Sequence, residues 1–117
     1  MIAKKYRITG RVEEEFFSTA QVWFLHWGRI YYRQGETTSG NVRFGIFVSP
    51  KRIASSVWRH RAKRRVATAL EELLAELAWQ PGEVVIVAGE RVLVQECEQI
   101  RRDLRYFWEK NWQAKKA

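Results

Sequence analysis

Residues 55–78, SSVWRHRAKRRVATALEELLAELA, determine how the rest of the chain is arranged. Apolar side chains recur at intervals of three or four residues in this stretch, at Ala62, Val66, Ala69, Leu70, Leu73 and Leu77. This spacing predicts an amphipathic helix with one apolar stripe facing a core. Ser55 or Ser56 can serve as its N-cap.

The first turns of this helix carry a dense basic cluster. Five of the seven residues from Arg59 to Arg65 are Arg or Lys, and a sixth is His60. Cations at a helix N-terminus oppose the helix dipole at a cost of about 0.3–1 kcal/mol each, so the cluster does not serve helix stability. Backbone N–H groups at the same end favour phosphate. The cluster therefore predicts a phosphate-binding surface, and the alternative is a solvated basic face.

The composition indicates one soluble domain over residues 1–117 with a polyanionic partner. The formal net charge is +8, and 46% of the residues are hydrophobic, which argues against a disordered basic tail. The single cysteine, Cys97, cannot form an internal disulfide and fits a reducing compartment. No apolar run approaches 18 residues, so we expect a cytoplasmic protein without a membrane partner.

The N-terminal quarter of the chain has a helical pattern. Apolar residues along one side predict a helix from about Arg11 to Trp27, at Val12, Phe16, Ala20, Trp23 and Trp27. Phe17 and Phe24 lie off this stripe. They either cover its edge or offer exposed rings for stacking.

Two strands are predicted next. Residues 29–33, RIYYR, form the first, and the polar run 34–41 reads as a hairpin loop. Residues 41–49 then alternate, so that Phe47 shares a face with Arg43. Together with Tyr31 or Tyr32, this face either forms an open aromatic and basic surface that binds single-stranded nucleic acid or lies under a helix.

The last third of the chain predicts a strand and a helix. Residues 83–88, EVVIVA, are typical of an interior strand, and a strand, a helix and a strand in succession predict a parallel pair. A final helix over residues 95–112 is expected to turn Cys97, Ile100, Leu104 and Trp108 inward. Outward arginines at 101, 102 and 105 are expected to form a second basic surface. The overall order predicts an α+β sandwich.

The sequence offers few groups for catalysis. His26 and His60 are the only histidines, and neither has an evident carboxylate or cysteine partner. No zinc-ligand spacing, Gly-rich phosphate loop or Ser/His/Asp order is present. We therefore expect the protein alone to be non-catalytic.

One segment resembles a known family. Residues 43–65, RFGIFVSPKRIASSVWRHRAKRR, resemble the signature of the bacterial ribonuclease P protein component, in which a strand leads through a short loop into Val-x-Arg-Asn-Arg-x-Lys-Arg at the start of a helix. The matching positions are Arg43, Gly45, Val48, Ser49, Lys51, Val57, Arg59, Arg61, Lys63 and Arg64. His60 replaces the motif asparagine, and Pro50 replaces a usual lysine.

The resemblance implies a fold as well as a function. The fold would be a two-layer α+β sandwich like the second domain of ribosomal protein S5, with a mixed sheet of about four strands, three helices in the order αββ(β)αβα, and a left-handed βαβ crossover. The function would be that of the protein subunit of ribonuclease P, whose partners are the ribonuclease P RNA and precursor tRNA, with no DNA expected. In that family the RNA subunit, using bound Mg²⁺, removes the 5′ leader of precursor tRNA.

Residue roles follow from the same resemblance. The residues expected to bind the RNA subunit are Arg52, Arg59, His60, Arg61, Lys63, Arg64 and Arg65. The residues expected to hold the single-stranded leader are Phe16, Phe17, Ile30, Tyr32, Arg43, Phe47 and Lys51. The alternatives are an RNA-chaperone or ribosome-associated module on the same fold, a protein-only nuclease and a protein–protein adaptor.

Overall fold

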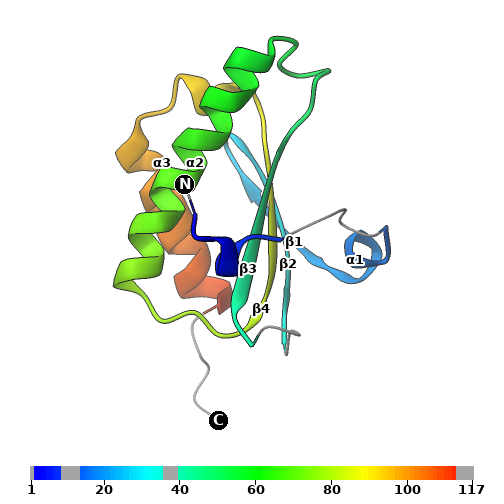
Figure 1. Ribbon diagram of the computed structural model, residues 1–117, viewed down its shortest axis with the longest axis vertical. Helices are drawn as coiled ribbons and strands as arrows, with labels where there is room; N and C mark the ends of the chain where they lie inside the picture. The colour runs from blue at the N-terminus through cyan, green and yellow to red at the C-terminus, as the bar shows by residue number, and fades with distance from the viewer. Residues whose placement is uncertain (1, 9–13, 36–39, 113–117) are drawn as a thin grey trace.

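The computed structural model describes residues 2–8, 14–35 and 40–112. Within them the chain forms three α-helices and four strands, joined by short 3₁₀ and π turns (Figure 1). The elements in chain order are η1 (Lys4–Tyr6), α1 (Glu14–Thr19), β1 (Gln21–Leu25), β2 (Gly28–Gln34), β3 (Val42–Val48), α2 (Ser56–Glu76), β4 (Gly82–Ala88), η2 (Glu90–Leu93), α3 (Cys97–Phe107) and η3 (Trp108–Trp112). In the described part of the chain, no helix is both long and apolar enough to cross a membrane.

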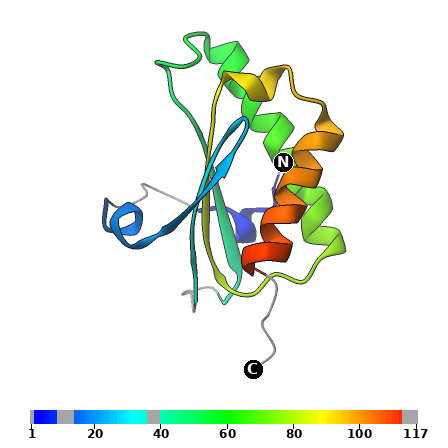
Figure 2. The ribbon, with the colours of Figure 1, turned by 180° about the vertical axis from the view of Figure 1, so that it is seen from behind.

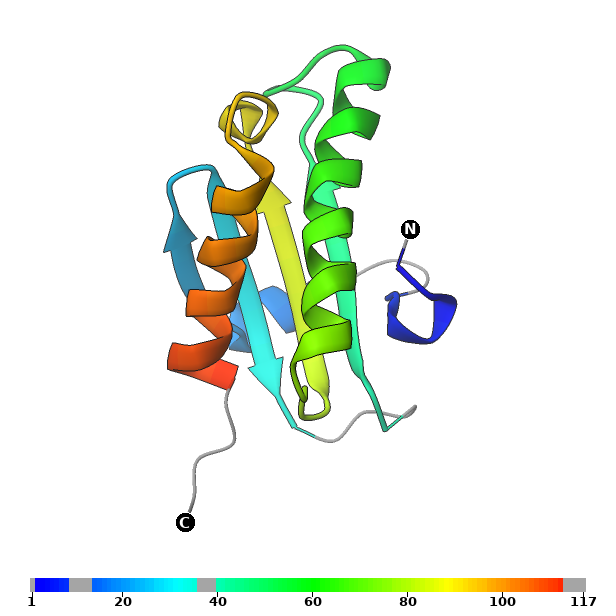
Figure 3. The ribbon, with the colours of Figure 1, turned by 90° about the vertical axis from the view of Figure 1, so that its left-hand side faces the viewer.

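The four strands form one mixed sheet in the order β1-β2-β4-β3. β4 pairs antiparallel with β2 and parallel with β3, so the predicted parallel pair is confirmed. Figure 3 shows α2 in front of the sheet as the chain passes from β3 to its neighbour β4, and this connection is left-handed. Such crossovers are right-handed in about 98% of proteins, and the exception was expected from the family resemblance alone.

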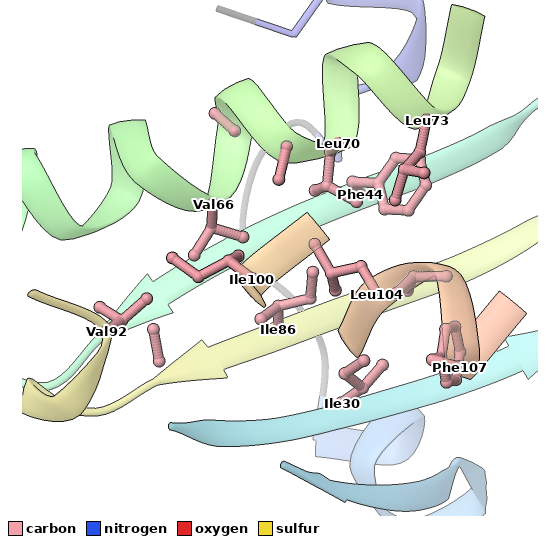
Figure 4. Close-up of a cluster of buried hydrophobic side chains, with 14 of the residues drawn as sticks. Ile30, Phe44, Val66, Leu70, Leu73, Ile86, Val92, Ile100, Leu104 and Phe107 are labelled. Carbon is pink, nitrogen blue, oxygen red and sulfur yellow. The ribbon is translucent and has the colours of Figure 1, made fainter. Parts of the chain in front are cut away.

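Helices α2 and α3 cover one face of the sheet, whereas α1 lies against the other face (Figures 1 and 2). The apolar stripe of α2 packs as its periodicity predicts, because Val66, Leu70 and Leu73 are fully buried. Figure 4 shows Val66 and Leu70 from α2 and Ile100 from α3 directed toward Ile86 of the central strand. The core of the molecule therefore lies between the two long helices and the sheet.

The predicted N-terminal helix is wrong beyond Thr19. In the described residues α1 covers only Glu14–Thr19, and the next residues form strand β1. The hydroxyls of Ser18 and Thr19 both donate to the carbonyl of Glu15, and such bonds accompany the last turn of the helix. The run Val22-Trp23-Phe24 is then β-branched and aromatic, which suits a strand. Arg11 and Val12 lie outside the described residues.

The predicted hairpin between β2 and β3 is also wrong. These strands do not pair with each other, because β4 inserts between them. The amide of Gly35 donates to the carbonyl of Pro81 (3.0 Å), which ties the end of β2 to the turn before β4. β4, which comes much later in the sequence, thus pairs with β2 in the position that the loop pattern predicted for β3.

Three of the four side chains predicted to turn inward from the C-terminal helix do so, since Trp108 also packs partly buried against the core. Ile100 and Leu104 are buried as expected, but Cys97 is exposed. The chain continues from α3 into the π turn η3, which buries Trp112 completely. The indole of Trp112 fills the space beside Gly82, where a Cβ would lie 2.5 Å from its ring. Any larger residue at position 82 would displace this tryptophan.

Candidate nucleic-acid interface

The N-terminal half of α2 presents an exposed group of basic side chains that we call the α2 basic surface: His60, Arg61, Lys63 and Arg64, with Lys51 and Arg52 from the preceding loop. None of the ion pairs within the described residues involves any of these six side chains. The sequence explains this, since no Asp or Glu occurs anywhere in residues 37–70. The surface is therefore strongly positive and available to an anion.

The packing of α2 and of the loop before it fixes the position of the α2 basic surface. Ser55 caps α2 by accepting a hydrogen bond from the amide of Trp58, as predicted. Ile53, from the loop, is buried in the core and fixes the entry of the helix. Ala62, Val66 and Leu70 then hold one face of α2 on the sheet, so the cations between them must face outward.

Two of the predicted RNA-binding arginines are engaged within the protein. Arg59 donates through Nη1 to the carbonyls of Ile53 (2.9 Å) and Ala54 (2.6 Å). Arg65 donates through Nε to the carbonyl of Val92 (2.8 Å) and through Nη2 to that of Gln95. These residues hold the loop before α2 and the turn η2 in place, so they add positive charge but position the surface rather than extend it.

The predicted second basic surface on α3 is wrong, because its arginines are paired. Arg101 contacts Glu76 (3.2 Å) and Glu72 (3.5 Å), and Arg105 contacts Glu76 (3.0 Å) and Glu109 (3.6 Å). Arg102 pairs with Glu98 one helical turn earlier (3.1 Å). The acidic second half of α2 thus neutralises α3, and this pairing joins the two helices along their exposed edge.

The sheet face opposite α2 and α3, which we call the open face, carries aromatic and cationic side chains in register. One row across the four strands is Phe24, Arg29, Val87 and Phe47. Phe24 is 74% exposed and Phe47 is 42% exposed, one on each edge strand. The next row places Tyr31 beside Val85 and Gly45. The row through Phe24 and Phe47 is exposed, as the aromatic and basic interpretation predicts, whereas Val85 in the next row is fully buried and α1 lies against this face, so the face is open in part and covered in part.

The alternation of β2 decides which tyrosine lies on the open face, and it is Tyr31. Ile30 and Tyr32 point into the core, where they are 0% and 8% exposed. The Tyr32 hydroxyl donates to Oδ1 of Asn111 (3.0 Å), and burial raises the pKa of this phenol. The placement of Ile30 and Tyr32 among the leader-contacting residues is therefore corrected, because neither side chain reaches the open face.

Helix α1 borders the open face with its two phenylalanines. Phe16 is buried, and Phe17 contacts Phe16 and Tyr31 edge-on, with ring centroids 5.4 and 5.1 Å apart. Arg33 lies over the ring of Phe16 (5.5 Å) while pairing with Glu83 (2.9 Å). Phe17 is thus the α1 aromatic that remains accessible beside Tyr31.

The remaining leader-contacting candidates lie at the β3 edge. Arg43 is on the open face, but its guanidinium donates to the carbonyl of Arg7 (3.0 and 3.2 Å) and so binds the N-terminal segment to β3. Lys51 is exposed beyond the end of β3. Phe47 and Lys51 therefore stand close along the chain at the junction between the open face and the α2 basic surface.

A hollow of about 590 Å³ adjoins this junction and includes cations outside the predicted set. Its lining includes His26, Arg29, Arg52 and Arg91, with the exposed ring of Phe24. A nitrogen of the Arg91 guanidinium lies 3.0 Å from Nε2 of His26. His26 and Arg29 lie at the β1–β2 connection, Arg52 precedes α2 and Arg91 is in η2, so the strand order brings them together, and only Arg52 among them was predicted from the sequence.

Metal-binding groups do not assemble in the described residues, which contain no cluster of three or more His, Cys, Asp or Glu side chains suited to a metal ion. The site offers cations, hydrogen-bond donors and aromatic rings. Such groups suit the binding of a polyanion with exposed bases.

Comparisons with known proteins agree with this geometry. The family model for Ribonuclease P matches residues 2–112. One structure of the RNase P protein from Staphylococcus aureus superposes with a TM-score of 0.72 at 17% identity, covering 90% of this chain and 94% of that one. A second structure of the RNase P protein from Staphylococcus aureus gives a TM-score of 0.69 at 18% identity, covering 100% of both chains. The RNase P protein from Thermotoga maritima gives a TM-score of 0.68 at 14% identity, covering 82% of this chain and 87% of that one.

A search among curated proteins found no significant match. The identities to the solved structures are low, so these structures by themselves establish the fold. The family match covers nearly all of the chain, including the basic helix and the sheet described above. The chain therefore belongs to the bacterial ribonuclease P protein family.

Proposed function

We propose that this chain binds the ribonuclease P RNA through the α2 basic surface and holds the single-stranded 5′ leader of precursor tRNA on the open face. The observation that carries this proposal is the contrast in ion pairing. The cations of the α2 basic surface have no carboxylate partner among the described residues, whereas the arginines of α3 do. An anion from outside the protein is the partner that the former group lacks.

Charge gives the protein its effect on the reaction. The RNA subunit and precursor tRNA are both polyanions, so bringing them together is opposed by repulsion. A protein of net charge +8 between them releases condensed counterions from both and lowers that repulsion. We propose that the holoenzyme consequently needs less Mg²⁺ than the RNA alone.

The open face suits a single strand of variable sequence. Phe17, Tyr31 and Phe47 offer rings on which bases can stack, at about 1–3 kcal/mol per base, without reading the base edges. Lys51 follows Phe47 along the chain, in the loop that leads to α2, where it can contact a phosphate of the same RNA strand. This arrangement binds many leader sequences with similar affinity.

Catalysis is assigned to the RNA subunit in this proposal. The described residues hold no ligand set for Mg²⁺, so the ion would be bound mainly by the RNA subunit and the substrate. The chain contributes binding, orientation and charge, and it would act in the cytoplasm, where precursor tRNA is processed.

The direct test is cleavage of a precursor tRNA by the cognate ribonuclease P RNA at low Mg²⁺, with and without this protein. We expect strong stimulation at low Mg²⁺ that shrinks as Mg²⁺ rises, because the metal then replaces the protein's charge. RNA binding without stimulation would identify a general RNA-binding module instead. Cleavage by the protein without any RNA subunit would contradict the assignment of catalysis to RNA.

A further inference from the structure

Trp58 differs from the other tryptophans of the chain. Four of the six donate their indole N–H to the protein: Trp27 to Asp103 (3.0 Å), Trp79 to Leu73 (3.3 Å), Trp108 to Ala78 (3.0 Å) and Trp112 to Gln80 (2.9 Å). Trp23 packs against the rings of Tyr106 and Phe107. Trp58 is 48% exposed, and its indole N–H has no acceptor within residues 2–8, 14–35 and 40–112.

The surroundings of Trp58 are cationic rather than apolar. The guanidinium carbon of Arg61 lies 5.3 Å from the centroid of the indole ring, a cation–π contact. His60 and Arg64 are exposed on the same helix, and the neighbouring Val57 is exposed as well. Figure 3 shows the first turns of α2 extending past the end of β4, so no strand covers this part of the helix.

We propose that Trp58 is a base-stacking residue that binds one unpaired nucleobase of the ribonuclease P RNA, with Arg61 against the ring. This inference rests on the proposed function and adds a contact to bases where the α2 basic surface otherwise offers contacts to phosphates. An indole ring stacks on any base, and its free N–H can donate to a base or sugar oxygen. The contact requires a base that is not paired in a helix, because only such a base exposes its face.

Charge selects RNA over another copy of this protein as the occupant. Two copies that met through Trp58 would bring two sets of cations together, since Arg61 lies against the ring, Arg64 is exposed one turn further along α2, and no described carboxylate pairs with either. Like charges at such an interface oppose association. A nucleotide supplies the ring and the negative charge in one ligand.

The test compares Trp58→Ala with Trp58→Phe in binding to the ribonuclease P RNA over a range of salt concentrations. We expect Trp58→Ala to weaken binding about 5- to 150-fold, which corresponds to the about 1–3 kcal/mol of one stacked base. The dependence of log Kd on log salt should keep its slope, because a neutral ring releases no counterion. Trp58→Phe should retain most of the affinity, and Val57→Ala is the matched exposed control without a ring.

The outcomes separate this inference from the proposed function. If Arg64→Ala weakens RNA binding and reduces the salt slope while Trp58→Ala changes nothing, the stacking inference fails and the proposed function stands. If neither variant matters, both fail. Self-association of the free protein that Trp58→Ala abolishes, seen by sedimentation, would assign the ring to a second copy and overturn the inference. Unchanged thermal unfolding of Trp58→Ala shows that folding is not the cause.

Discussion

Helices α2 and α3 lie side by side on the sheet and both carry outward arginines, yet the two sets of arginines differ in their ion pairing. The arginines of α3 are paired with glutamates of α2 and of α3 itself, at 3.0–3.6 Å. Arg61 and Arg64 of α2 have no such partner in the described residues. Counting positive charges on a helix therefore does not separate the two surfaces, whereas the presence or absence of nearby carboxylates does.

The largest effect is expected from matched double variants of the two helices. Arg61→Ala/Arg64→Ala and Arg102→Ala/Arg105→Ala remove the same charge. We expect the α2 pair to weaken binding to the RNA subunit by about 100-fold or more, because each charged contact contributes about 1.5–3 kcal/mol. The slope of log Kd against log salt should also fall by about 1.5–2. The measurement is a filter-binding titration over a range of salt.

The α3 pair is the control for this experiment. Its guanidiniums are already neutralised by Glu76, Glu98 and Glu109, so removing two of them should change RNA affinity only a few-fold. Equal losses for the two double variants would show that total charge governs binding, and the contrast between the helices would then have no functional meaning.

The second prediction extends the contrast to aromatic residues. Tyr31 lies on the open face and Tyr106 is exposed on α3, so both can be changed to alanine without opening the core. Tyr31→Ala should weaken binding of the holoenzyme to precursor tRNA about 5- to 150-fold, the equivalent of one lost stacked base, and leave mature tRNA unaffected. Tyr106→Ala should alter neither affinity. A loss on mature tRNA as large as on the precursor would exclude a leader contact.

A third prediction concerns the arginine of α2 that serves the fold. Arg65 donates to the carbonyls of Val92 and Gln95 from a partly buried position, so Arg65→Ala should lower the free energy of unfolding by about 1–2 kcal/mol. Arg105→Ala removes only exposed ion pairs and should cost less than about 1 kcal/mol. Urea denaturation measures both. If Arg65→Ala leaves stability unchanged, its hydrogen bonds do not hold η2.

The smallest effect is expected from a variant that removes ion pairs of the α3 arginines. Glu76 contacts both Arg101 and Arg105, so Glu76→Gln removes one carboxylate partner from each guanidinium with little change in shape, while Glu72 and Glu109 remain. We expect nonspecific affinity for single-stranded RNA to rise about two- to fivefold at low salt, with an unfolding cost below about 1 kcal/mol. Glu14→Gln, an exposed carboxylate on α1, is the control for the change in net charge. Equal gains in the two variants would mean that the ion pairs do not mask α3.

Part of this contrast is readable in the sequence and part is not. The cluster at residues 59–65 and the absence of acids from 37–70 are local features of the chain, and they are sufficient to mark the α2 basic surface. The pairing of Arg101 with Glu72 and Glu76 depends on how two helices pack, and periodicity within each helix does not contain that information. The hydrogen bonds of Arg59 and Arg65 also depend on tertiary structure, because their carbonyl acceptors lie in the loop before α2 and in η2.

The strands show the same division between local and tertiary information. Alternation correctly placed Phe44 and Phe47 on opposite faces of β3, because a two-residue period is a property of the strand itself. It left Tyr31 and Tyr32 undecided, because both faces of β2 bear aromatic residues. β1 was missed, since Trp23 also fitted a helical stripe with Ala20 and Trp27, and only pairing with β2 resolves that ambiguity.

The strand order has a consequence for synthesis on the ribosome. β4 is the last strand of the sheet to be made, yet it lies between β2 and β3 and joins β3 to the β1–β2 pair. Translation adds about 5–20 residues per second, so β3 and the α2 helix emerge well before the strand that joins them to the β1–β2 pair. During that interval the nascent chain would expose apolar strand residues beside the basic residues of α2. On the proposed function, the residues that bind RNA would emerge before the sheet is complete, and early contacts with RNA or with a chaperone would fall within this interval.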